Sequence, residues 1–399
     1  MKAIRNGILI LPDENGHFAA FTDFVLCYDE RITATVPAED FSPSDADEII
    51  DATGAYVAPG LLNVHIHGCD GADTMDEDAN ALTRLAAFQA KTGVTSFLPT
   101  TMTCAFDAVE RALVRIRAAM AEQGSRGARI LGAHMEGPFI SPAKKGAQDE
   151  HYILPAAFEK IAPYADVIKI ITVAPETLTE KDFIENCRAH GIVVSIGHTS
   201  ADYETARAAI AAGATHVTHL CNAMTPLNHR HPGVLGAGLD TDANCELIVD
   251  NVHVHPAMQR IIYAAKRGAH IIPITDSLRA CGLGDGESEL GGQVVRVSGQ
   301  VAALKDGTIA EASFTGVGCA ISQASTSLMI DLIEGQPVEK AEHLIALFLG
   351  MIKGTITDDD ALEELADAAA LKNIANLPAR VKCAVLSWHT LDEALHEGK

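Results

Sequence analysis

The feature that most constrains the fold is an alternation of two kinds of segment that begins after Pro59. Short aliphatic runs, each long enough for one strand, alternate with Ala-rich stretches in which apolar residues recur at helical spacing. Strictly alternating strands and helices indicate a parallel sheet, because each helix carries the chain back to the edge from which the next strand starts. The runs interpreted as strands are GLLNVHIHG, TSFLPTT, ARILGAHMEG, DVIKIITVAPE, IVVSIGHTS, THVTHLCNAM, CELIVDNVHV and HIIPITDS.

Eight such units in roughly 250 residues predict a closed (β/α)8 TIM barrel, an α/β fold of about that length. A doubly wound open sheet is the alternative. The composition agrees with a parallel sheet buried on both faces, because 48% of the residues are hydrophobic and only 5% are aromatic. Aliphatic side chains must therefore fill most of the core.

The segments on either side of this alternation have a different pattern. Residues 1–58 contain strand-like runs such as ILILP and FVLCY and no convincing helix. Residues 287–315 carry Gly and Asp-Gly turns, which predict hairpin strands. The end of the chain contains one further strand candidate, CAVLSW. We therefore predict a barrel over residues 59–365 and a small β-sandwich domain formed by both termini, 1–58 and 366–399.

Charge and hydropathy narrow the possible partners. The chain has 30 Lys and Arg residues against 53 Asp and Glu residues, which gives a formal net charge of -23. Such a surface repels nucleic acids and anionic membranes, so neither is expected as a partner. The first residues do not resemble a signal peptide, and no apolar run reaches the ~18 residues of a membrane span.

Cysteine usage indicates a reducing compartment. The nine cysteines are scattered singly, without a CxxC pair. This pattern is typical of cytoplasmic proteins, so a cytoplasmic location is predicted. Cys69, Cys221 and Cys281 lie close to the motifs described below, and we interpret them as small packing residues rather than ligands or nucleophiles.

Polar residues stand where the predicted barrel strands end. His65 and His67 share one face of the first strand, because side chains alternate along a strand. Barrel active sites lie at the carboxyl ends of the strands. Single polar residues end four later strand candidates: Glu136, His198, His219 and Asp276. Converging at one end of a barrel, these imidazoles and carboxylates would suit zinc or another divalent first-row metal.

Asp276 has a distinct predicted role by elimination. A metal-dependent amidase needs a carboxylate that carries a proton from the attacking water to the leaving amine. An aspartate on the last barrel strand could do this. Asp276 could also be a further metal ligand or cap the following segment, and either role is compatible with the first.

Five motifs together resemble the N-acetylglucosamine-6-phosphate deacetylase family of the amidohydrolase superfamily. They occur in order between about residues 50 and 310: HIHG, HMEGPFISPAKKGAQ, SIGHTSADYE, THLCNAMTPLNHRHPG and TDSLRACGLGDGESELGGQ. The glutamate of EGPF, in place of a lysine on a later strand, separates this family from its urease-like and dihydroorotase-like relatives. The resemblance implies hydrolysis of N-acetylglucosamine-6-phosphate to glucosamine-6-phosphate and acetate.

The resemblance also implies roles for individual residues. Glu136, His198 and His219 would hold the principal metal, and His65 and His67 a second one. Asp276 would be the general base and then the general acid. The residues implied in substrate binding, on the phosphate side or the sugar side, are Asn222, Ala223, Arg230, His253, Ala147 and Gln148.

Cofactor and assembly follow from the same resemblance. One or two divalent metal ions per subunit are expected, zinc first, with iron, cobalt or manganese as alternatives. The partner is a small amino-sugar phosphate. In the family the phosphate-binding arginine, here Arg230, can come from the neighbouring subunit, so a homodimer is expected.

The chain departs from the family pattern in places, and its closing strand is reduced to CAVLSW. Gln148 stands where many members have His, and Glu311-Ala312-Ser313 replaces a usual Gly-Ser stretch that helps to hold the sugar. Other functions stay open at this point. They are deacetylation of a related amino sugar, a cyclic amidase or deaminase activity on the same scaffold, and a non-catalytic relative that binds sugar phosphates.

Overall fold

The computed structural model of this chain divides into two units, Met1–Leu62 and Asn63–Lys399, and each is described by itself. The described residues are 1–13, 18–122, 127–284, 286–290, 293–298, 301–304, 309–312, 320–333 and 335–376, with 381, 384–385, 387–389, 391–392 and 395 near the end of the chain. Within these residues no helix is long and apolar enough to cross a bilayer.

The N-terminal unit is built from two small sheets. One has the order β5-β4-β1-β6, in which β1 pairs antiparallel with β4 and parallel with β6, and the other has the order β3-β2-β7. Its elements are β1 (Lys2–Arg5), β2 (Ile8–Pro12), β3 (Phe18–Phe21), β4 (Phe24–Tyr28), β5 (Ile32–Pro37), η1 (Ala38–Asp40), η2 (Pro43–Asp45), β6 (Glu48–Asp51) and β7 (Tyr56–Val57). The predicted small β domain is therefore present in the N-terminal segment, around buried Ala3, Val25 and Cys27.

The second unit contains the predicted barrel. Its strands follow one another around the sheet in chain order, and the neighbours from β11 to β18 pair in parallel. The barrel strands are β8 (Leu61–Ile66), β11 (Val94–Thr101), β13 (Ala133–Glu136), β14 (Ile168–Val173), β15 (Val193–Ile196), β16 (His216–Val217), β17 (Asn244–Ile248) and β18 (Ile271–Ile274), and the short β12 (Arg129–Ile130) also pairs with β11.

Hydrogen bonds join the first barrel strand to the chain that follows the last one. Asp276 N donates to His65 O at 3.0 Å, and His67 N donates to Ser277 O at 3.0 Å. β8 pairs with β11 on its other side. An open sheet has two free edges, whereas here the first and last strands meet, so the barrel prediction is confirmed and the open-sheet alternative is wrong.

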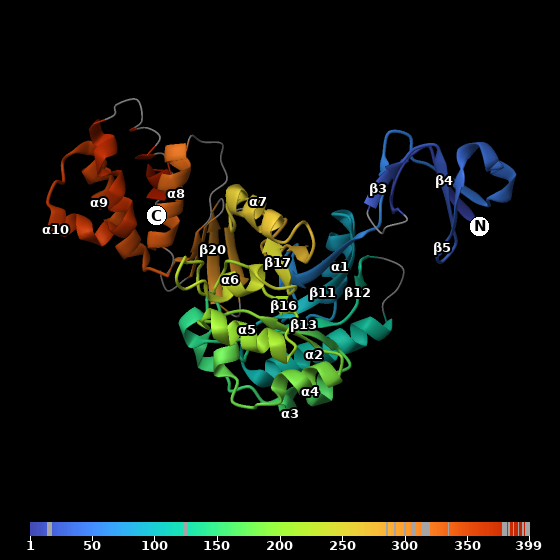
Figure 1. Cartoon of the computed structure of the whole chain (residues 1–399), viewed down its shortest axis with the longest axis horizontal. Coiled ribbons are helices and arrows are strands. Elements are labelled where there is room, and N and C mark those ends of the chain that lie inside the picture. The colour runs from blue at the N-terminus through green and yellow to red at the C-terminus, as the bar shows by residue number, and fades with distance from the viewer. Residues whose placement is uncertain are drawn as a thin grey trace. The chain divides into compact units, whose positions relative to one another are not determined.

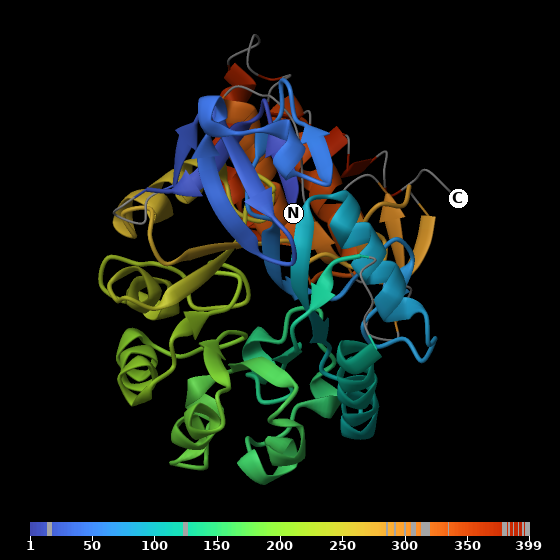
Figure 2. The ribbon, with the colours of Figure 1, turned by 90° about the vertical axis from the view of Figure 1, so that its right-hand side faces the viewer.

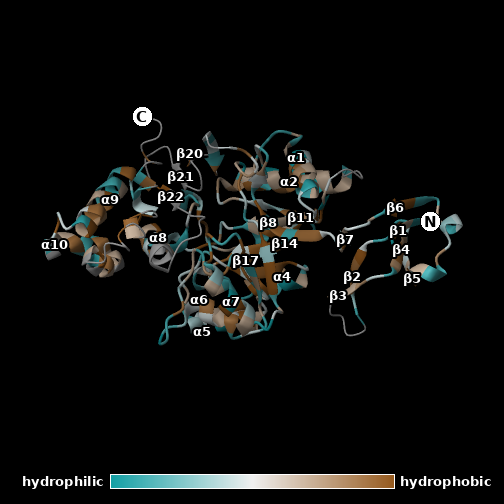
Figure 3. Ribbon diagram, turned by 90° about the horizontal axis from the view of Figure 1, so that it is seen from above, coloured by the Kyte–Doolittle hydropathy of each residue, from teal (hydrophilic) through white to brown (hydrophobic). Residues whose placement is uncertain are grey.

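Helices surround the strands, as the teal to yellow ribbons show in Figure 2. In Figure 3 the hydrophobic colour is concentrated on barrel strands such as β11 and β14. The connections contain β9 (Gly68–Cys69), β10 (Ala72–Asp73), α1 (Ala81–Lys91), α2 (Phe106–Glu122), η3 (Pro142–Lys144), η4 (Glu150–Tyr152), α3 (Phe158–Ile161), η5 (Ala162–Tyr164), η6 (Pro175–Thr177), α4 (Phe183–Ala189), α5 (Tyr203–Ala212), α6 (Gly233–Leu239) and α7 (Pro256–Ala265).

Local sequence explains where α5 begins and ends. The Asp202 side chain accepts a hydrogen bond from Thr205 N at 2.8 Å, which satisfies one of the free N–H groups of the first turn. Gly213 ends the helix with a φ of 118°, a conformation that suits glycine because it has no Cβ. Ala206 and Ala209 form the buried face, and these short side chains let the helix lie close to its neighbours.

The barrel interior has an aliphatic layer and a polar layer. The aliphatic layer contains five buried residues from five strands: Val64, Leu98, Ile170, Ile248 and Ile274. The polar layer contains five fully buried residues: His134, Thr172, Ser195, Thr218 and Glu246. Because buried polar groups need partners, the second layer depends on its internal hydrogen bonds, and the candidate site adjoins it.

The C-terminal part of this unit differs from the barrel. Figure 1 shows strands near β20, followed by the orange and red helices α8 to α10. The strands form an antiparallel sheet in chain order, as predicted for 287–315 wherever that segment is described; Ser313 and the two residues after it lie outside the description. The elements are β19 (Gly286–Leu290), β20 (Gln293–Ser298), β21 (Val301–Leu304), β22 (Ile309–Ala312), α8 (Ala320–Ile333), α9 (Val338–Lys353), α10 (Asp359–Leu362) and η7 (Glu363–Asn376).

These helices have a hydrophobic core of their own, and the terminal strand predicted in CAVLSW is wrong. The described residues of that run, including Ala384 and Trp388, are helical. Trp388 is fully buried, stacks on Phe348 with ring centroids 3.9 Å apart, and donates from Nε1 to Ser325 Oγ at 2.9 Å. Buried Ala384, Trp388 and Leu391 recur at helical spacing, which explains the difference. No described residue of 366–399 lies in either sheet of the N-terminal unit.

Candidate metal centre

The structure brings the six predicted metal-site and catalytic residues together at the carboxyl ends of the barrel strands. Five of them are buried, and the side chain of Asp276 is 19% exposed to solvent. Their ligand atoms form two groups in which all atoms lie within 4.8 Å of one another. The first group is Glu136, His198 and His219, and the second is His65, His67 and Asp276.

The first group has the donor atoms of a metal site. Glu136 Oε1 lies 3.1 Å from His198 Nε2 and 3.2 Å from His219 Nε2. His198 Nδ1 lies 2.9 Å from the carbonyl oxygen of Lys144, which can only accept, so Nδ1 is the protonated nitrogen. His198 Nε2 therefore directs a lone pair at His219 Nε2, 3.1 Å away. Two imidazole nitrogens and a carboxylate oxygen in this arrangement suit zinc or a similar divalent ion.

The second group has a matching arrangement. Asp276 Oδ1 lies 3.2 Å from His65 Nε2 and 3.3 Å from His67 Nε2. His65 Nε2 is buried and has no hydrogen-bond partner among the described residues. A metal ion would satisfy such a nitrogen, whereas an unpaired buried polar atom destabilises a protein. Glu136 Oε2 lies 3.3 Å from His67 Nε2, so the carboxylate of Glu136 faces both groups.

Three of these residues have a left-handed backbone, with φ of 46° at His198, 26° at His219 and 49° at Asp276. Each stands just after its strand ends, where the chain turns over the top of the barrel. A non-glycine residue in this conformation costs about 1–3 kcal/mol, and such residues concentrate at functional sites. The backbone is therefore strained where the ligand atoms converge.

The pKa values follow from burial and from opposite charges. Burial raises the pKa of Glu136, but the imidazoles of His198 and His65 outweigh it and hold this pKa well below its ordinary value. Burial likewise raises the pKa of Asp276, and His65 and His67 hold it below its ordinary range. Burial lowers the pKa of His219, but the hydrogen bond to Glu136 raises it to about 9. The protein without metal therefore holds protons that a divalent ion would replace.

Gln148 and Ala147 lie near this centre. Gln148 is buried, donates from Nε2 to Glu136 Oε2 at 2.6 Å, and accepts from Thr103 N at 2.7 Å. Ala147 is partly buried and packs against the small cluster of Met102 and Leu290. Gln148 therefore fixes the orientation of the Glu136 carboxylate.

The residues implied on the phosphate side are more exposed. Asn222 and Ala223 form the turn after His219, in which Asn222 N donates to His219 O at 2.9 Å. His253 Nδ1 lies 2.6 Å from Asp250 Oδ2. Arg230 lies in an exposed loop, and its side chain has no hydrogen bond or ion pair with any described residue. No hydrogen bond or ion pair among the described residues therefore joins Arg230 to the six-residue centre of the same chain.

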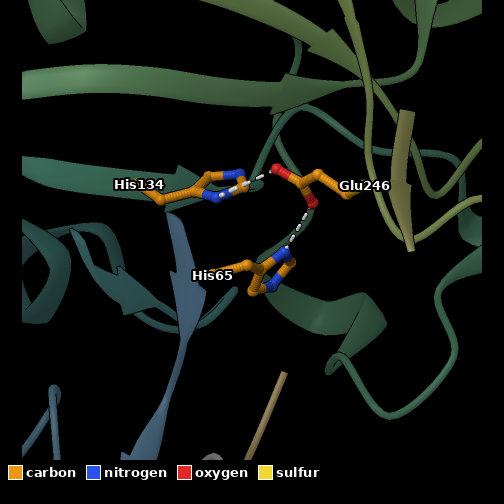
Figure 4. A group of neighbouring side chains, drawn as sticks. All are labelled: His65, His134 and Glu246. Atoms are coloured by element: carbon orange, nitrogen blue, oxygen red, sulfur yellow. Dashed lines mark hydrogen bonds and ion pairs between the residues drawn. The ribbon is translucent and has the colours of Figure 1, made fainter. Parts of the chain in front are cut away.

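Sequence reasoning missed two residues that adjoin the centre, Glu246 of β17 and His134 of β13. Figure 4 shows the Glu246 carboxylate between the imidazoles of His65 and His134. Glu246 Oε2 lies 2.9 Å from His65 Nδ1, and Oε1 lies 3.8 Å from His134 Nδ1. The signal was an acidic residue inside the aliphatic run CELIV, since an acidic side chain in a buried strand needs a partner.

The cysteines near the centre are not ligands in either group. Cys69 is buried and Cys221 is partly buried, and burial raises the pKa of each thiol to about 12. Cys281 is exposed, so it does not pack in a core as expected. All seven described cysteines are free.

Two family models match overlapping parts of the chain. The amidohydrolase family model matches residues 56–308, which cover the barrel and the candidate centre. A second model, the NifU-like N terminal domain, matches residues 270–397. The departure at Glu311-Ala312-Ser313 falls outside the first match and inside the second.

Three similar proteins are deacetylases of N-acetylated amino-sugar phosphates. N-acetylglucosamine-6-phosphate deacetylase of Bacillus subtilis (strain 168) is 41% identical over 284 residues, 69% of this chain and 72% of the relative. N-acetylgalactosamine-6-phosphate deacetylase of Escherichia coli O157:H7 is 34% identical over 75% of this chain and 78% of the relative. A solved structure of N-acetyl-D-glucosamine-6-phosphate deacetylase from Mycobacterium smegmatis is also similar, with a TM-score of 0.68 and 27% identity. The alignment covers 85% of this chain and 86% of that chain. That structure is an Asp-to-Ala mutant in complex with N-acetyl-D-glucosamine-6-phosphate.

Proposed function

Because this chain belongs to the amidohydrolase family, and within it to the N-acetylglucosamine-6-phosphate deacetylases, we propose how its buried centre performs that reaction. The protein hydrolyses the acetamide of N-acetylglucosamine-6-phosphate to glucosamine-6-phosphate and acetate. The observation that carries the assignment of the site is the convergence of Glu136, His198 and His219 within hydrogen-bond distance of one another.

The centre is a metal site in this proposal. A divalent ion held there would supply Lewis-acid chemistry, lowering the pKa of a water molecule and polarising the acetamide carbonyl. Glu136, His198 and His219 would be its ligands, and His65 and His67 would hold a second ion. Zinc is the proposed metal, because mixed imidazole and carboxylate ligands suit it.

Asp276 is the proposed proton carrier. Its Oδ1 lies 3.2 Å from His65 Nε2 and 3.3 Å from His67 Nε2, at the centre where the water would be held, so this carboxylate can accept the proton of the attacking water. It then delivers that proton to the sugar nitrogen as the C–N bond breaks, which leaves acetate and a free amine. The partial exposure of Asp276 supports this role, because the proton carrier must reach the substrate.

Arg230 and His253 are proposed to bind the phosphate, with Asn222 and Ala223 beside them, and Ala147 and Gln148 are proposed to contact the sugar. The net charge of -23 repels a phosphorylated substrate at long range, so the site needs local cations. Arg230 is exposed and has no side-chain partner among the described residues, which supports its contribution to a neighbouring subunit in a homodimer. The seven described cysteines are free, which supports a cytoplasmic location.

The E. coli relative makes the galactosamine epimer the second candidate substrate. The test is a panel of N-acetylglucosamine-6-phosphate, N-acetylgalactosamine-6-phosphate and unphosphorylated N-acetylglucosamine, with free amine and acetate both quantified. We expect equal amounts of the two products, the highest kcat/KM with the glucosamine substrate, and little turnover without phosphate. No release of amine from either phosphate would contradict the proposed site.

A further inference from the structure

Glu246 contacts one residue from each of the two ligand groups. Its Oε2 lies 2.9 Å from His65 Nδ1, and it also accepts a hydrogen bond from the backbone N–H of His219 at 3.3 Å. His65 belongs to the group with His67 and Asp276, and His219 belongs to the group with Glu136. The buried carboxylate of Glu246 therefore contacts the ends of two strands, β8 and β16, which carry ligands of different groups.

The contact with His65 determines which of its nitrogens faces the centre. A carboxylate accepts hydrogen bonds, so His65 Nδ1 donates and carries the proton. His65 Nε2 then has its lone pair free, and this atom lies 3.2 Å from Asp276 Oδ1 and 3.4 Å from Glu136 Oε1. A hydrogen bond to the distal nitrogen of a metal-binding histidine fixes the tautomer and the ring orientation.

The contact with His219 acts on a strained backbone. His219 has a φ of 26°, which is unfavourable for any residue with a side chain. The bond from His219 N to Glu246 supplies a partner for an N–H that the short strand β16 leaves outside its ladder. This contact holds the turn that directs His219 Nε2 toward Glu136 Oε1 at 3.2 Å.

A third metal ion between His65, His134 and Glu246 is the competing interpretation of the cluster in Figure 4. Both nitrogens of His134 already have partners, Nδ1 with Val64 O at 3.0 Å and Nε2 with Thr172 Oγ1 at 2.8 Å. Thr172 Oγ1 continues to Thr218 Oγ1 at 2.7 Å. His134 is therefore part of the polar layer inside the barrel and has no free lone pair for an ion.

We propose that Glu246 is a positioning residue that orients His65 and His219 and so couples the two metal-ligand groups. The inference rests on the metal centre proposed above. Glu246 touches neither the substrate nor the reacting atoms in this account. It acts on metal affinity through the two histidines, and its effect must appear before any substrate is added.

The test uses the full chain with Glu246→Gln, which keeps an acceptor and loses the charge, and Glu246→Ala, which loses both. Ser195→Ala is the matched control, because Ser195 is fully buried in the same polar layer and bonds Thr218 Oγ1 at 2.6 Å. Metal-free protein is titrated with Zn²⁺ and with Co²⁺ against a chromogenic chelator. The cobalt absorption spectrum and the unfolding of the metal-free protein are recorded in parallel.

We expect Glu246→Gln to weaken metal binding about 10-fold and Glu246→Ala about 100-fold, the range found for residues that support metal ligands. The cobalt spectrum should change in both variants, and Ser195→Ala should match the wild type. If both Glu246 variants lose stability but bind metal as the wild type does, the role is structural and the proposal is wrong; if Glu246→Ala does not fold, Glu246→Gln decides. Wild-type protein that binds no metal would instead contradict the metal centre itself.

Discussion

Asp276 Oδ1 lies 3.2 Å from His65 Nε2, so a carboxylate from the end of the barrel faces an imidazole from its first strand. These residues are 211 positions apart in the chain, and the backbone bond from Asp276 N to His65 O at 3.0 Å shows that barrel closure brings them together. The proposed proton carrier is therefore placed by the same contacts that complete the fold.

Asp276→Asn should separate proton transfer from metal binding. The amide retains the size of the carboxylate but cannot take a proton from water, so kcat should fall by about 10²–10⁴-fold, the usual contribution of a general acid–base group. Metal analysis of the purified variant should show the principal ion retained. An Asp276→Asn enzyme with near-normal kcat would rule out the assigned role.

Arg230→Ala should act on phosphate recognition. A charge-assisted hydrogen bond to a phosphate contributes about 1.5–3 kcal/mol, so KM for the phosphorylated substrate should rise about 10-fold or more while kcat changes little. Slow turnover of unphosphorylated N-acetylglucosamine should be unaffected, which makes it the internal control. An equal loss on both substrates would place Arg230 outside the phosphate site.

His134 should make the folded protein sensitive to acid. Burial, followed by the nearby charge of His65, lowers the pKa of His134 from 6.5 to about 4. The unfolded chain therefore binds a proton that the folded chain excludes, and stability falls as the pH drops from about 6.5 to about 4, by up to about 3 kcal/mol.

The measurement for His134 is urea unfolding of metal-free protein at about pH 7 and about pH 5, with His134→Gln as the comparison. The amide can keep a hydrogen bond to Thr172 and does not titrate in this range. The variant should lose less stability than the wild type between these two conditions. Equal losses would show that His134 is not the source of the acid sensitivity.

Trp388→Ala should destabilise the helices of the C-terminal part. It removes the ring stacked on Phe348 and leaves a cavity in a separate core, which typically costs about 3–5 kcal/mol. Limited proteolysis should then cleave α8 or α9 sooner, while Trp388→Phe should behave more like the wild type. Metal content should be the same in both variants, because none of the proposed ligands belongs to that core.

The barrel and the convergence of its polar strand ends could be predicted because both follow from short-range patterns. Aliphatic runs separated by helical stretches indicate a parallel barrel, and residues at the ends of its strands must meet at one rim. His65, Glu136 and Asp276 were found in this way, although they are far apart in the sequence.

The remaining features depend on contacts that no local pattern reveals. Glu246 looks like one acidic residue in a strand, and its importance appears only when β8 and β16 are placed beside it. The left-handed backbone of His219 could not be predicted, because a glycine usually indicates this conformation and residue 219 is a histidine. CAVLSW reads equally well as a strand or as a turn of helix, and packing of Trp388 in the helical core decides between them.

The most direct test of the central claim is a metal titration of the full chain, with amine release from N-acetylglucosamine-6-phosphate measured at each point. Metal-free protein should be inactive, and activity should rise with added Zn²⁺ to a plateau at one or two ions per subunit. Glu136→Gln should bind far less metal and remain inactive at the same concentrations, because Glu136 faces both ligand groups. Full activity in the metal-free protein, or in Glu136→Gln without bound metal, would contradict the account.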